Sequence, residues 1–131
     1  MNANGESKIQ SSEDYLEKIL MLSKELDNVR AIDLAKDLNY SKPSISIALK
    51  KLVDEEYVTI DEKGSIYLTI NGREIAEKVY AKHLLLSSFL IAIGVERDIA
   101  VEEACAIEHH LSDKSFEALK TFYENNIKDN N

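Results

Sequence analysis

The segment that most constrains the fold is a pair of short amphipathic helices joined by a tight turn. Residues 30–38 (RAIDLAKDL) have apolar side chains at helical spacing, and Asn39-Tyr40 interrupts the pattern. Ser41 is a typical N-cap, and Pro43 falls in the first turn of the next helix, where its missing N–H costs nothing. That helix has apolar residues at positions i, i+3, i+4 and i+7, so we expect them to face inward: Ile45, Ala48, Leu49 and Leu52.

Two short β-rich runs follow, at 57–60 and 66–69, and they flank the sequence DEKGS. This pattern predicts a hairpin in which Gly64 supplies the turn. Upstream, Ser11-x-x-Asp14 resembles a capping box and predicts a first helix from Ser11 to about Glu25. Helix, helix, turn, helix and hairpin is the order of a winged helix-turn-helix.

The second half of the sequence is predicted to be helical. A long helix opens at Thr69 or Asn71 and reaches about Ile93, with Gly94 as its breaker. Two more helices are expected over 99–111 and 112–125. We therefore expect a mainly α chain: a flexible tail (1–10), a winged helix-turn-helix domain (11–75), a helical domain (76–125) and a second flexible tail (126–131).

The composition excludes several classes of protein. Hydrophobic residues make up 44% of 131, enough for a packed core, and no apolar run approaches the ~20 residues of a membrane span. The first residues lack a signal-peptide pattern, and a single cysteine excludes an internal disulfide. We find no nucleophile–base pairing and no phosphate-binding glycine loop. These features predict a cytoplasmic protein that is not an enzyme.

Charge is distributed unevenly along the chain. The whole sequence carries a net charge of −8, but residues 30–51 have five bases against two acids, and residues 96–131 have nine acids against four bases. A whole-chain sum hides such local differences. This polarity suits a protein that contacts phosphate with one end and gathers cations with the other.

The second helix of the helix-turn-helix has the chemistry of a major-groove reader. Serine and lysine side chains bond phosphates or base edges, and an exposed isoleucine can contact a thymine methyl. The candidate DNA-binding residues are Ser41, Lys42, Pro43, Ser44, Ser46, Ile47, Lys50 and Lys51, with Lys63 at the hairpin tip. The alternative for any single lysine is a solvated surface charge. Winged helices also serve as protein-interaction modules, so the fold alone does not establish DNA binding.

A second cluster of functional side chains lies near the end of the chain. On a helix, Cys105, Glu108 and His109 occupy i, i+3 and i+4, which places a thiolate, a carboxylate and an imidazole on one face. Such a set can hold a divalent transition metal, and His83 is a candidate fourth ligand. Each residue also has a structural alternative: a lone cysteine is often a small buried hydrophobe, and His83 lies beside a leucine run.

These stretches resemble the diphtheria-toxin-repressor family of metal-dependent regulators, near its short manganese-sensing branch. The resemblance rests on SSEDYLEKIL, SKPSISIALKKLVDEEYV, LTINGREIA and EACAIEHHLSD, and spans about residues 11–123. It implies a homodimer formed through the C-terminal helices, which would make residues 76–125 a helical metal-binding and dimerisation domain. It also implies binding to double-stranded operator DNA, repression of metal-uptake genes, and six metal ligands: Asp14, Glu17, His83, Cys105, Glu108 and His109.

Two positions mix the family's patterns. Cysteine at position 105 is typical of iron sensors, whereas aspartate at position 14 is typical of manganese sensors. Carboxylates are hard donors that suit Mn²⁺, and they outnumber the single soft thiolate. We therefore favour Mn²⁺ over Fe²⁺ as the effector, with Zn²⁺ or Co²⁺ able to substitute in vitro. Cys105 has a second way to ligate, through its backbone carbonyl with the thiol protonated.

The positions of the ligands suggest a mechanism. Asp14 and Glu17 fall in the DNA-binding half and the other four in the second half, so a bridging cation would fix the spacing of the recognition helices. One rival is a winged-helix regulator that senses a small organic ligand in an apolar pocket near residues 84–93, without metal. A second rival is a winged-helix protein-interaction module.

Overall fold

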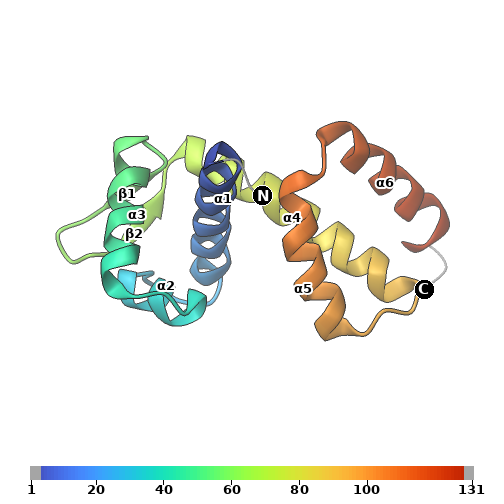
Figure 1. The fold of residues 1–131 in the computed structure, drawn as a ribbon, viewed down its shortest axis with the longest axis horizontal. Helices are drawn as coiled ribbons and strands as arrows, with labels where there is room; N and C mark the ends of the chain where they lie inside the picture. Colours follow the sequence, from blue (N-terminus) through green and yellow to red (C-terminus); the bar gives the residue numbers. More distant parts are fainter. Residues whose placement is uncertain (1–3, 129–131) are drawn as a thin grey trace. The chain divides into compact units, whose positions relative to one another are not determined.

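The chain is mainly α-helical with one small hairpin, as expected. The structure is a computed structural model that describes residues 4–128, and side chains from Ser12 onward. Its elements, seen in Figure 1, are α1 (Asn4–Ser23), α2 (Ala31–Leu38), α3 (Lys42–Asp54), β1 (Val58–Ile60), β2 (Ile66–Leu68), α4 (Ile70–Ala92), α5 (Arg97–Ile107), the 3-10 turn η1 (Glu108–His110) and α6 (Asp113–Asn126). No helix in the described part of the chain is long and apolar enough to cross a bilayer.

The chain divides into two compact units, Met1–Glu77 and Lys78–Asn131, and the division falls inside α4. In the first unit, α2 packs on α1 and on α3, while α1 contacts β2 and α3 contacts β1. The core residues come from each of these elements: Leu16, Ile19, Leu20, Leu34, Ile45, Leu49, Leu52, Val58 and Ile66. The apolar stripe expected on α3 is therefore confirmed, with Ala48 half-buried at its edge.

The turn between α2 and α3 forms as the sequence predicts. Asn39 adopts the left-handed conformation (φ 58°), and its N–H donates to the carbonyl of Ala35. A short polar side chain tolerates this conformation better than most residues. The Ser41 Oγ then accepts a hydrogen bond from the N–H of Ser44 at 3.3 Å, so Ser41 is the N-cap of α3. Two helices are thus held together by a turn of three residues.

The hairpin is closed by a network around Asp61. Strand β1 pairs antiparallel with β2, with Thr59 opposite Tyr67. In the turn, the Asp61 carboxylate accepts backbone N–H groups from Lys63 and Ser65, and Gly64 adopts φ +86°. These N–H donors, led by that of Ser65, hold the pKa of Asp61 below its ordinary value. The hairpin therefore presents a structured tip.

The hairpin is also joined to the start of α4 by close backbone packing. The Thr69 hydroxyl donates to the Glu56 carbonyl at 2.7 Å and accepts the N–H of Gly72. A Cβ at Gly72 would overlap the carbonyl of Tyr57, so glycine is required there. The end of the hairpin and the first turn of α4 are consequently closely joined.

The second unit contains the C-terminal part of α4 together with α5, η1 and α6. Leu86 of α4 and Ala100 and Ala104 of α5 are buried. Phe89 lies beside two aromatic rings of α6, those of Phe122 and Tyr123. Gly94 ends the long helix with φ +108°, which confirms its predicted role as a breaker.

Two expectations about helix bounds are wrong. Helix α1 begins at Asn4, within the expected tail of 1–10, because extending a formed helix costs little and Ser11 caps only if its own backbone leaves the helix. The helix expected over 99–111 ends at Ile107 and continues as η1, which tightens the last turn before the chain leaves the helix at Leu111. Residues 1–3 and 129–131, from the two predicted tails, lie outside the described residues.

Candidate metal centre

Three predicted ligands come together in the second unit. His83 lies on α4, Cys105 on α5, and Glu108 is the first residue of η1. One donor atom from each of these residues lies within 4.8 Å of the other two. Two donors on opposite sides of a single ion would be about 4.4 Å apart for metal–ligand bonds of ~2.2 Å. The three side chains are therefore arranged closely enough to share one cation after small rotamer changes.

His83 and Glu108 form the buried part of this cluster. Glu108 is 1% exposed and His83 is 9% exposed. The His83 Nδ1 lies 3.0 Å from the Glu108 Oε1. Two ligands at right angles around an ion, each bonded at ~2.1 Å, are also about 3 Å apart. The two atoms form a hydrogen bond whose length is also compatible with two neighbouring ligands of one ion.

The second carboxylate oxygen of Glu108 supports this assignment. Its Oε2 is buried and has no hydrogen-bond partner among the described residues. Burying a carboxylate is unfavourable unless a partner compensates for the lost hydration. A divalent cation would supply that compensation. The donor set of one imidazole, one carboxylate and one exposed thiol therefore fits a transition metal.

The other three predicted ligands are placed differently. His109 is half-buried in η1 and is not part of the three-residue cluster. The i, i+4 argument assumed an α-helix through position 109, whereas residues 108–110 form a 3-10 turn with three residues per turn. Asp14 is half-buried and Glu17 is 4% exposed on α1, in the first unit. Their role as ligands, like that of His109, stays a prediction.

The face of α3 that was predicted to read DNA is exposed. Ser41, Lys42, Pro43, Ser44, Ser46, Lys50 and Lys51 are all exposed, and so is Lys63 in the hairpin turn. Ile47 is 72% exposed, which is unusual for a large aliphatic side chain in a folded protein. The cationic and apolar side chains predicted to contact DNA are therefore all accessible.

Comparisons with known proteins identify both units. Residues 9–66 match the N-terminal DNA-binding domain of the iron-dependent repressors, and residues 69–130 match their metal-binding and dimerisation domain. An HTH-type transcriptional regulator of Methanocaldococcus jannaschii is 40% identical over 117 residues, covering 88% of this chain and 94% of the relative. The HTH-type transcriptional regulator MntR of Bacillus subtilis is 34% identical over 109 residues, covering 83% and 77%.

Solved structures give the same result. The structure of the manganese regulator SloR superposes with a TM-score of 0.76 and 33% identity, over 86% of this chain and 53% of that one. The chain thus spans about half the length of that protein, but nearly all of the Methanocaldococcus relative. The matched domains carry the exposed recognition helix and the three-residue cluster, respectively. This chain belongs to the iron-dependent repressor family of metal-dependent, DNA-binding transcriptional repressors.

Proposed function

We propose that the chain binds operator DNA as a homodimer when Mn²⁺ occupies the cluster of His83, Cys105 and Glu108, and that it thereby represses genes of metal uptake. The buried Glu108 carboxylate, with one oxygen lacking a partner among the described residues, is the observation that carries this proposal. Membership of the family favours it over a regulator of an organic ligand or an interaction module.

The choice of Mn²⁺ over Fe²⁺ rests on the donor atoms. Glu108 is a hard donor, and Asp14 and Glu17, which we propose as further ligands with His109, would add two more carboxylates. Hard oxygen donors suit Mn²⁺, whereas the thiolate of Cys105 raises affinity for Zn²⁺ and Co²⁺ in vitro. The likeness to a manganese regulator supports the same choice.

The two units would have separate tasks. On α3, Lys42, Lys50 and Lys51 bind phosphates, and Ser46 and Ile47 contact base edges. In the second unit, His83 and Glu108 hold the effector in a buried position that water reaches poorly. A bound divalent cation would supply positive charge that offsets part of the excess of acids in residues 96–131. Metal and DNA would then strengthen each other's binding through one shared conformation.

Glu108→Gln tests the proposal, because it keeps the size of the side chain and removes its charge. We expect operator affinity measured by fluorescence anisotropy to lose its response to Mn²⁺, while weak metal-independent binding remains. The matched control is His110→Gln, at an exposed histidine two residues along the same turn. Metal-stimulated binding that survives in Glu108→Gln would refute the assignment. Wild-type binding that ignores both EDTA and Mn²⁺ would favour the organic-ligand rival.

A further inference from the structure

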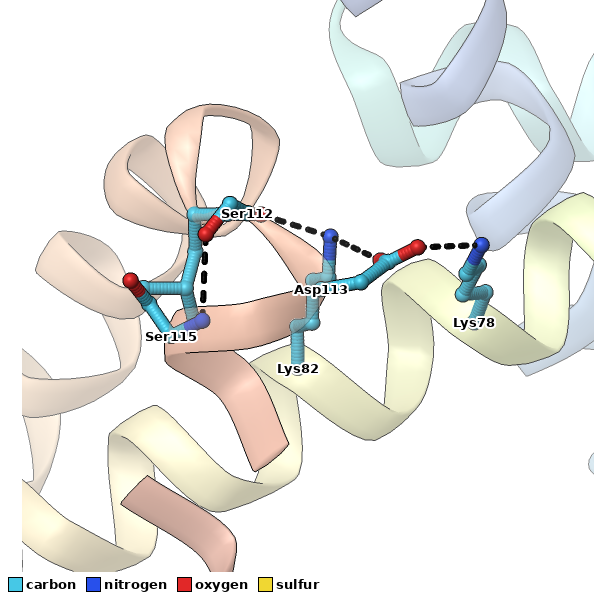
Figure 2. Close-up of polar contacts among 6 residues, drawn as sticks. Lys78, Lys82, Ser112, Asp113 and Ser115 are labelled. Atoms are coloured by element: carbon cyan, nitrogen blue, oxygen red, sulfur yellow. Dashed lines mark hydrogen bonds and ion pairs between the residues drawn. The ribbon is translucent and has the colours of Figure 1, made fainter. Parts of the chain in front are cut away.

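Beside the metal cluster, Lys82 contacts both a backbone carbonyl and a carboxylate. Its Nζ donates a hydrogen bond to the backbone carbonyl of Leu111 at 2.7 Å and lies 3.3 Å from an Asp113 carboxylate oxygen. The side chain is only 13% exposed although it is a lysine. Figure 2 shows Lys82 extending from α4 towards the start of α6, with Asp113 between it and Lys78.

The position of Leu111 shows which part of the chain Lys82 holds. Leu111 is the residue that follows η1, and its backbone leaves the helical conformation (ψ 121°). Carbonyls at the end of a helical turn lack partners within the helix, and a lysine can satisfy one of them. Three residues earlier lies Glu108, whose carboxylate must meet His83. Lys82 therefore holds the far end of the turn that carries Glu108.

Lys82 and His83 are also neighbours on α4. One residue binds the backbone just after η1, and the next binds the side chain of its first residue. Ser87, one turn further along, donates to the His83 carbonyl at 2.8 Å. Two adjacent side chains of α4 thus contact both ends of the same short segment. A shift of η1 relative to α4 would break both contacts together.

We propose that Lys82 is a positioning residue of the metal centre: by binding the Leu111 carbonyl, it holds η1 so that the Glu108 carboxylate stays beside His83. The proposal rests on the function proposed above. Residues behind the ligands of a metal site typically affect its affinity by 10- to 100-fold when they are replaced. No local pattern in the sequence marks Lys82, because its partner is a backbone carbonyl 29 residues away.

The test compares three variants by their affinity for Mn²⁺, measured from the electron paramagnetic resonance signal of the free ion. Lys82→Met keeps the apolar stem but removes the donor, and we expect Mn²⁺ to bind it about 10-fold or more weakly. Lys82→Arg keeps a cationic donor and should retain most of the affinity. The matched control is Lys78→Met, which removes the other lysine from Asp113 at a site that is 60% exposed, and should change affinity little.

Two further measurements separate positioning from general stability. The visible spectrum of bound Co²⁺ reports ligand geometry, and we expect it to change in Lys82→Met but not in Lys78→Met. In a double-mutant cycle, Lys82→Met should cost much less when Glu108 is already glutamine, because the two residues act through one contact. If Lys82→Met does not fold by circular dichroism, Lys82→Gln, a shorter side chain, takes its place and is read in the same way.

The possible results distinguish this inference from the proposal on which it rests. Wild-type protein that binds no Mn²⁺ would overturn both. Wild-type binding with an unchanged affinity and Co²⁺ spectrum in Lys82→Met would overturn the role of Lys82 alone. Equal losses in Lys82→Met and Lys78→Met would do the same, because the effect would then belong to Asp113 rather than to the Leu111 carbonyl.

Discussion

At the scale of single residues, Cys105 determines how soft the metal site is. It is the one cysteine of the sequence, and its side chain is exposed at the edge of a cluster whose other members are buried. A thiolate prefers Zn²⁺ and Co²⁺, whereas carboxylates accept Mn²⁺. The selectivity of the site therefore depends on whether Cys105 binds through its sulfur.

Cys105→Ser should lower the affinity for Co²⁺ more than the affinity for Mn²⁺. We expect their ratio to change about 10-fold, or ~1.4 kcal/mol, because serine offers a harder and less acidic donor of similar size. Isothermal titration calorimetry with each metal measures the ratio. A ratio equal to that of the wild type would show that the sulfur is not a ligand, and would favour ligation through the backbone carbonyl.

At the scale of elements, the first turn of α6 is held by an N-cap and by ion pairs with α4. Ser112 is the N-cap of α6, and its Oγ accepts the N–H of Ser115 at 3.0 Å. Asp113 pairs with Lys78 at 2.9 Å and with Lys82 at 3.3 Å, both on α4. Hydrogen bonds from these lysines, with their positive charge, lower the pKa of Asp113 below its ordinary value of 3.8. The start of α6 is therefore sensitive to acid.

Asp113→Asn should flatten the acid dependence of stability. Because the pKa is lower in the folded chain, the ion pairs contribute fully above the ordinary pKa and are lost as pH falls through the folded value. We expect the midpoint of thermal unfolding to fall less between pH 5 and pH 3, about one unit on either side of the ordinary pKa, in Asp113→Asn than in the wild type. Asp113 is well exposed, so the difference should be modest. Glu117→Gln, at an exposed acid of the same helix, is the control, and identical curves for all three proteins would contradict the expectation.

At the scale of the whole molecule, an acidic protein has to bind an acidic polymer. The net charge is −8, yet residues 30–51 carry a local excess of bases, and the lysines of α3 are exposed. Binding to DNA then depends on the local field and on counterions released from the phosphates. The rest of the molecule repels DNA, which restricts contact to one surface.

Operator binding should accordingly weaken steeply as salt is added. Lys50→Ala should reduce the slope of log K against log salt by about one for each phosphate that the protein no longer neutralises, and should weaken binding to all sequences alike. Lys24→Ala, outside α3, is the control and should keep the wild-type slope. Anisotropy titrations at several salt concentrations measure both. Failure of the Mn²⁺-loaded protein to bind DNA even at low salt would favour the interaction-module rival.

Much of the DNA-binding unit was predictable because its signals are local. The Ser41 cap, the break at Asn39, the stripe of Ile45, Leu49 and Leu52 and the glycine of the hairpin each act within a few residues of the chain. Capping, turn conformation and helical periodicity are properties of short segments. The same reasoning failed at Ser11, because a serine inside a helical stretch has the same sequence pattern as one that begins it.

The metal centre could be predicted only in part from the sequence, because its geometry depends on tertiary structure. The sequence by itself determined which donor side chains exist and that Cys105 and Glu108 are one turn apart. Only the packing of α4 against η1 decided that His83 meets Glu108, 25 residues away, and that the predicted helix ends in a 3-10 turn at these residues. The physical reason is that such contacts depend on how the helices pack against one another. No short segment of sequence specifies that packing alone.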